Sequence, residues 1–117
     1  MKPFRELKVW QKAHEITIEV YRITKKFPAD ELYGLTSQMR QSASSVGANI
    51  AEGCARGGDA ELERFPRIVM GSACKPEYHV LHSRDLDLIA NYSYENINVR
   101  IYRGEINAKF TYFEDIF

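Results

Sequence analysis

Hydrophobic residues recur every three or four positions along most of the chain, a spacing typical of amphipathic α-helices. The spacing predicts helices over residues 5–26, 32–55, 60–89 and 94–117, and Gly34 is a point at which the second of them can break. Helix-stopping sequences stand between them, namely Phe27-Pro28, Gly57-Gly58 and Asn91-Tyr92-Ser93. No segment alternates apolar and polar residues as a strand does. The pattern therefore predicts an all-α fold, an antiparallel up-and-down four-helix bundle, with residues 1–117 as a single domain.

The first predicted helix carries two groups of apolar residues on different faces. One group suits the bundle core and consists of Val9, Ala13, Ile16, Val20, Ile23 and Phe27. The other lies away from it and consists of Leu7, Trp10, Ile18 and Tyr21. Because a helix in an isolated bundle needs only one apolar face, the second group predicts an interface between the subunits of a homo-oligomer. A wide core contact within one subunit is the alternative.

The second predicted helix combines a core stripe with a polar face. The stripe consists of Leu32, Leu35, Met39, Ala43, Val46 and Ile50. The polar face is rich in hydrogen-bonding groups and poor in charge, and it includes Gln38, Ser45, Asn49 and Glu52. Such a face is typical of a polar network between helices or subunits. A contact surface for a ligand or a nucleic acid is the alternative.

The charge of the chain is balanced overall and uneven locally. Sixteen basic and sixteen acidic residues give a net charge of zero, which excludes a uniformly basic nucleic-acid binder. Residues 1–26, however, hold seven basic and three acidic residues. Candidate phosphate contacts on the first two helices are Lys8, Lys12, Arg22, Lys26, Arg40 and Arg56. The alternative is a solvated face on which Lys12 pairs with Glu15 and Arg22 with Glu19.

Other chemistry receives little support from the sequence. Cys54, Cys74, His79 and His82 lack the paired spacing of a zinc site, so no metal or cofactor is expected. Neither a nucleophile elbow nor a phosphate-binding loop is present, and no enzymatic activity or small-molecule substrate is expected. Apolar runs are too short for a membrane span. Two cysteines are too few for a disulfide framework, so a cytoplasmic location is predicted.

Several phrases of the sequence occur together in one protein family. They are Leu7-Lys8-Val9-Trp10-Gln11-Lys12-Ala13, the stretch Glu31-Leu32-Tyr33-Gly34-Leu35-Thr36-Ser37-Gln38-Met39-Arg40, and Ser45-Val46-Gly47-Ala48-Asn49-Ile50-Ala51-Glu52-Gly53. On these residues the chain resembles the four-helix bundle proteins encoded in 23S rRNA intervening sequences of bacteria. The resemblance implies a helical bundle that assembles into a ring-like homo-oligomer, a pentamer in the known form, without enzymatic activity. Related accessory subunits of diversity-generating retroelements bind nucleic acid.

The third predicted helix departs from the family pattern. Pro66 and Pro76 stand where that pattern usually has leucine, and Asp87 stands where glycine is common. Proline inside a helix removes a backbone hydrogen bond and crowds the preceding turn, at a cost of about 3 kcal/mol each. We therefore expect this helix to be kinked by Pro66 and Pro76, or broken near Cys74-Lys75.

Taken with the resemblance, these patterns predict a non-enzymatic, homo-oligomeric helical bundle that serves as a binding or scaffold protein. The resemblance to the family implies RNA or another nucleic acid as the partner, and a ring would repeat the candidate phosphate contacts, so that weak sites act together. The alternative is a protein-interaction module that does not bind nucleic acid and uses the polar face of the second helix.

Overall fold

The computed structural model describes residues 3–56, 59–90 and 94. Within these residues the chain forms three α-helices, α1 (Lys8–Thr24), α2 (Ser37–Arg56) and α3 (Asp59–Asp85). Short helical turns precede α1 and α2, namely η1 (Phe4–Glu6), η2 (Ala29–Glu31) and η3 (Leu32–Thr36). The described residues contain no strand, so the all-α prediction is confirmed for this part of the chain.

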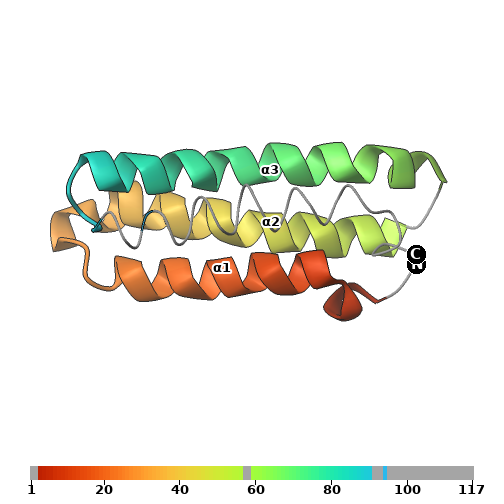
Figure 1. The fold of residues 1–117 in the computed structure, drawn as a ribbon, viewed down its shortest axis with the longest axis horizontal. Helices are drawn as coiled ribbons and strands as arrows, with labels where there is room; N and C mark the ends of the chain where they lie inside the picture. The colour runs from red at the N-terminus through yellow and green to blue at the C-terminus, as the bar shows by residue number, and fades with distance from the viewer. Residues whose placement is uncertain (1–2, 57–58, 91–93, 95–117) are drawn as a thin grey trace.

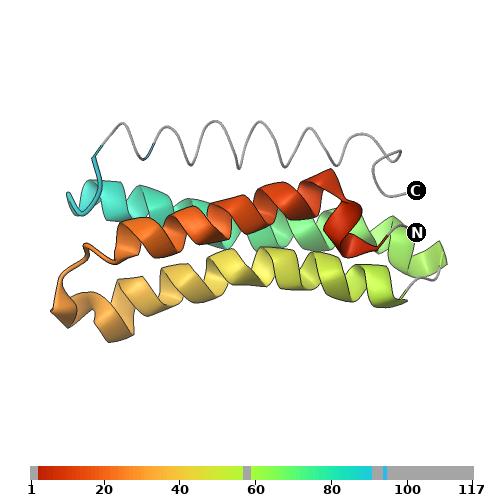
Figure 2. The ribbon, with the colours of Figure 1, turned by 90° about the horizontal axis from the view of Figure 1, so that it is seen from below.

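The three helices lie side by side and run alternately up and down (Figures 1 and 2). α2 is the central element, since it packs against α1 on one side and against α3 on the other. The fourth helix expected over residues 94–117 lies outside the described residues, apart from Tyr94. The four-helix arrangement therefore stays a prediction.

The core is built from the predicted stripes of the first two helices. α1 buries Val9, Ala13, Ile16 and Val20, and α2 buries Met39, Ala43, Val46 and Ile50. α3 adds Ala73, Pro76 and Val80 from the part of the helix whose side chains are described. Removing this apolar surface from water is the main favourable term in folding, at roughly 25 cal/mol per Å².

Leu7 corrects the predicted oligomer interface. The first helix was expected from residue 5, but α1 begins at Lys8, and Leu7 has an extended backbone with φ −76° and ψ 127°. Its side chain is fully buried in the core. The helical periodicity does not apply to a residue before the first turn, and for this reason Leu7 packs inward although it was placed on the outer face.

The start of α2 contains a turn wider than an α-helical one. Residues Leu32–Thr36 form a π-helical turn, and the backbone of Gly34 within it is not helical. This is the break that the glycine suggested in the sequence. Leu35 and Thr36 follow Gly34, keep the register of α2 and are buried. Leu32, placed in the core by its spacing, and Tyr33 precede the glycine, and the non-helical backbone takes them out of that register, so that they are 47% and 92% exposed.

The third helix runs without interruption from Asp59 to Asp85, so it is not broken near Cys74-Lys75. Pro76 lies within it and is buried. The kink expected at Pro66 and Pro76 stays a prediction. The helix ends in a Schellman motif, in which the amide of Leu88 donates to the carbonyl of Ser83 and that of Asp87 to Arg84.

Asp87 is the residue at which the backbone of this motif turns. Its φ of 59° lies in the left-handed region, where glycine is normally preferred. The position at which the family pattern usually has glycine is thus one that requires a left-handed backbone. An aspartate tolerates that conformation better than most side chains, although less well than glycine.

A small polar network crosses the core between α2 and α3. Ser42 Oγ lies 2.8 Å from His79 Nδ1, and both side chains are buried. Ser83 Oγ donates to the carbonyl of His79 at 2.8 Å and lies 3.0 Å from Met39 Sδ. These contacts satisfy polar groups that would otherwise be costly to bury. They also fix the register between the two helices.

The network makes stability depend on pH. Burial lowers the pKa of His79 below its ordinary value of 6.5, and the positive charges of Lys75 and His82 lower it further. The unfolded chain then binds more protons than the folded chain below about pH 6.5. We expect the free energy of unfolding to fall as the pH is lowered through that value. Urea denaturation across a pH series measures this slope.

The histidine responsible can be identified by substitution. His79→Gln keeps a hydrogen-bonding group near Ser42 and removes the titration, so it should flatten the slope. His14→Gln, at an exposed histidine that stacks on Trp10, serves as the control and should leave the slope in place. An unchanged slope in His79→Gln would assign the pH dependence to another group.

Candidate nucleic-acid interface

The candidate basic residues of the first helix lie on its exposed side, and two of them have acidic partners. Lys12 Nζ lies 3.4 Å from Glu15 Oε2, and Arg22 Nη1 lies 2.7 Å from Glu19 Oε2. Both pairs are separated by three positions on α1, as the solvated-face alternative predicted. Lys8 and Lys26 are exposed as well. Because exposed pairs of this kind contribute little energy, about 0–1 kcal/mol, a phosphate can compete for the cations.

A hollow of about 320 Å³ lies beside the end of α1. It is lined by Glu19, Arg22, Ile23, Lys26, Leu88, Ile89 and Ala90. The two cations here share the hollow with Glu19, which already pairs with Arg22. The hollow therefore presents mixed rather than purely positive charge.

The two arginines of α2 differ in their surroundings. Arg56 Nη2 lies 2.5 Å from Glu52 Oε1 on the surface of the helix. Arg40 is half-buried and takes part in none of the ion pairs that the described residues form. Among the six candidates, Arg40 has the best-defined orientation and no acidic side chain against it in the described part of the chain.

Arg40 is held by two contacts with α1. Its Nε donates a hydrogen bond to Thr24 Oγ1 at 2.8 Å, and its guanidinium lies 4.9 Å from the centre of the Tyr21 ring. Thr24 is buried, and its hydroxyl donates to the carbonyl of Val20 at 2.7 Å, which leaves an oxygen lone pair to accept from Arg40. No hydrogen bond between described residues uses the terminal nitrogens of the guanidinium, which can therefore donate to other acceptors.

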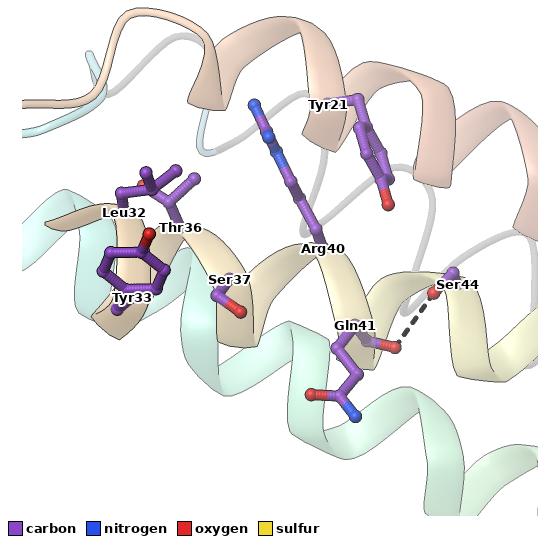
Figure 3. A pocket seen from close by; sticks show the side chains of 8 residues that line it. All are labelled: Tyr21, Leu32, Tyr33, Thr36, Ser37, Arg40, Gln41 and Ser44. Carbon is purple, nitrogen blue, oxygen red and sulfur yellow. Dashed lines mark hydrogen bonds between the residues drawn. The ribbon is translucent and has the colours of Figure 1, made fainter. Parts of the chain in front are cut away.

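Arg40 lines a groove of about 540 Å³ (Figure 3). α1 contributes Tyr21, the wide turn contributes Leu32, Tyr33 and Thr36, and α2 contributes Ser37, Arg40, Gln41 and Ser44. Arg40 extends between Tyr21 on one side and Leu32 and Thr36 on the other. The groove thus combines a cation, two phenol rings and several groups that form hydrogen bonds.

Thr36 is the unusual polar residue of the groove. It is only 3% exposed, and its hydroxyl has no hydrogen-bond partner within the described part of the chain. A buried hydroxyl without a partner costs about 1–3 kcal/mol. Thr36 faces inward because it lies three residues before the buried Met39, on the core face of α2.

The predicted polar face of the second helix divides between two environments. Asn49 Nδ2 donates to Ser72 Oγ of α3 at 2.5 Å, and Ser45 Oγ donates to the carbonyl of Ser42 at 2.7 Å. Gln38 and Glu52 are exposed. The expected polar network between helices is present at Asn49, which is therefore committed to holding α2 against α3.

The remaining candidates for the oligomer interface differ in accessibility. Trp10 is partly buried, with its ring stacked on His14 at 4.9 Å and close to Gly47 of α2. Ile18 is 48% exposed and Tyr21 41% exposed. Trp10 thus contributes largely to packing within the chain, and Ile18 and Tyr21 are the members of the group with free apolar surface.

The described residues offer neither a metal cluster nor a membrane span. No three histidine, cysteine or carboxylate side chains among them converge as metal ligands. Cys54 and Cys74 are free thiols, and burial raises the pKa of Cys54 above its ordinary value. None of the helices in this part of the chain is both long and apolar enough to cross a bilayer.

Three residues of the site were not identified from sequence. Nothing in the helical pattern distinguishes Thr24 and Thr36 from other polar residues. Tyr33 stands next to Leu32, which the pattern assigned to the core. The available signal was Gly34, whose position near the start of the second helix suggested a break. Which side chains face inward on either side of that break could be determined only from the backbone of the structure.

A family model described as 23S rRNA-intervening sequence protein matches residues 5–104 of the chain. No curated protein matches the chain.

The two threonines of the site should respond in opposite ways to loss of the hydroxyl. Thr36→Val replaces a group without a partner by a methyl of the same shape, so stability should be unchanged or should rise by about 1 kcal/mol. Thr24→Val removes the acceptor of Arg40 and should lower stability by about 1–3 kcal/mol. Urea denaturation of both variants measures the difference. Equal destabilisation would show that the Thr36 hydroxyl is bonded in solution.

Proposed function

Because the chain belongs to the 23S rRNA-intervening sequence protein family, we propose that it is a non-enzymatic RNA-binding bundle that works as a homo-oligomer. The observation that carries this proposal is the position of Arg40. Its guanidinium is oriented by Thr24 and Tyr21, is not neutralised by a carboxylate of the described residues, and opens on a groove. An oriented guanidinium suits the two oxygens of a phosphate.

Self-association would strengthen RNA binding because each copy of the chain adds the same cationic side chains. A single chain with zero net charge binds a polyanion weakly, and only a few phosphates can be neutralised by one copy. A ring would repeat Arg40 and the exposed cations of α1 around one axis, so that weak sites act together on one strand. The exposed apolar surface of Ile18 and Tyr21 is the part of α1 suited to contact a second copy.

A second candidate function is a protein-interaction module that does not bind nucleic acid. It is favoured by the acidic partners of Lys12 and Arg22, which reduce the positive potential of the α1 surface. The exposed side chains of Leu32 and Tyr33 would serve such a module as apolar contacts. The two functions differ in their dependence on salt.

RNA binding should weaken with rising salt and should depend on Arg40. For a labelled single-stranded RNA, each phosphate contact contributes about 0.7 to the slope of log K against log salt. Arg40→Gln is expected to weaken binding about tenfold and to reduce this slope by about 0.7. Fluorescence anisotropy at several salt concentrations measures both quantities.

The matched control is the other arginine of α2. Arg56→Gln removes a cation that pairs with Glu52, and it should change the affinity less than about twofold. Lys12→Glu combined with Arg22→Glu tests the α1 surface in the same assay. If the unmodified protein retains no RNA at low salt and these charge reversals change nothing, the RNA-binding proposal fails.

The proposed assembly depends on the exposed apolar surface of α1. Ile18→Asp places a charge in that surface and should shift the protein to a smaller species at equal concentration, because burying an unpaired charge is costly. Leu86→Asp is the control, since Leu86 is equally exposed at the end of α3. Sedimentation velocity measures the species. An unmodified protein that stays monomeric at all concentrations would contradict the proposal.

A further inference from the structure

The groove beside Arg40 brings a cation, two phenol rings and several hydrogen-bonding side chains together in one open hollow. Its volume of about 540 Å³ lies in the range of about 300–1,000 Å³ that small-ligand pockets occupy. It is formed where the wide turn of η3 meets α1 and α2 (Figure 3).

The first component of the site is a guanidinium prepared for an anion. The hydrogen bond from Nε to Thr24 and the Tyr21 ring beneath the guanidinium remove much of the freedom of a long side chain. None of the ion pairs or hydrogen bonds of the described residues uses its terminal nitrogens. A ligand that meets an oriented cation loses less entropy on binding than one that must order it.

The second component is the buried hydroxyl of Thr36. Thr36 lines the groove although the residue is only 3% exposed, and its hydroxyl has no partner within the described residues. A ligand oxygen that accepts this hydroxyl would recover a hydrogen bond that folding leaves unmade. A phosphate supplies such an oxygen, and it carries others for Arg40.

The third component is a flat apolar surface at the edge of the groove. Tyr33 is 92% exposed, and Leu32 beside it is 47% exposed, so neither side chain contributes much to folding. A free phosphate would leave this surface unused. Exposed aromatic rings next to a cation are the usual means by which proteins hold the bases of single-stranded nucleic acids.

We propose that the groove holds one nucleotide unit, with its phosphate on Arg40 and Thr36 and its base against Tyr33. The choice of a nucleotide over other aromatic anions rests on the proposed function. The same chemistry is offered by a free nucleotide and by one residue of an RNA strand. The two sources are separated by the experiment below.

The test is a titration of the full-length protein, followed by NMR, with ligands that carry different parts of a nucleotide. We expect adenosine 5′-monophosphate to saturate the site. Adenosine and ribose 5-phosphate, which lack one half each, should bind about tenfold more weakly, as should inorganic phosphate. If a short oligoadenylate displaces the monophosphate, the source of the nucleotide unit is RNA. If it does not displace the monophosphate, the ligand is the free nucleotide.

Substitutions at exposed or tolerant positions assign the ligand to the groove. Tyr33→Ala should weaken binding of the monophosphate about tenfold, and Tyr33→Phe should restore it, because the ring is retained. Thr36→Val should weaken it without loss of stability. Arg22→Gln removes a cation outside the groove and is the control for charge. Circular dichroism checks that each variant is folded.

Three outcomes would overturn the inference. The first is no saturable binding of the monophosphate. The second is binding of the monophosphate that Tyr33→Ala and Thr36→Val leave unchanged. If RNA is still retained in that case, the assignment of the nucleotide to the groove is wrong and the proposed function stands. The third is a change of sedimentation in Tyr33→Ala without a change in nucleotide affinity, which would assign the groove to a second copy. Nucleotide binding without any RNA binding would support the groove and contradict the proposed function.

Discussion

The kink of the backbone at Gly34, just before α2, determines most of what this protein can present to a partner. An α-helix that continued regularly back from α2 would bury Leu32, because Leu32 and Thr36 are four residues apart and would share one face. The kink takes Leu32 and Tyr33 out of this register, so that they face solvent while Leu35 and Thr36 stay buried. The Cβ that any other residue would add at Gly34 would lie 3.3 Å from the Glu31 carboxylate that caps this turn. The groove exists because α2 begins in this way.

The neighbours of each basic side chain, more than the number of basic residues, determine where this protein presents positive charge. Lys12, Arg22 and Arg56 each lie against an acidic side chain on the same helix. Arg40 instead contacts a hydroxyl and a phenol ring on another helix. A pairing within one helix can be read from spacing, whereas a contact between helices depends on how their axes cross. The charge balance of the chain alone therefore says little about where an anion would bind.

The fold was more predictable than the site for a physical reason. Burial follows the period of a regular helix, so the stripe from Val9 to Val20 and the stripe from Met39 to Ile50 were identified from spacing alone. Prediction was wrong where the backbone departs from that period, at Leu7 before α1 and at Leu32 in the wide turn. The family resemblance is confirmed by the match to residues 5–104. It drew attention to position 87, where glycine is common in the family and where the backbone of Asp87 is left-handed. Polar contacts between helices, such as Ser42 with His79, leave no signal in a single sequence.

The central position of α2 has a mechanical consequence. Successive residues of this helix are committed to opposite neighbours, with Arg40 held to α1 and Ser42 held to α3. A rotation of α2 about its axis that broke the contact of Arg40 with Thr24 would also lengthen the contact of Ser42 with His79. The contacts of α2 with α1 and with α3 are therefore coupled through less than one helical turn, so that neither neighbouring helix can shift against α2 without disturbing the contact on the other side.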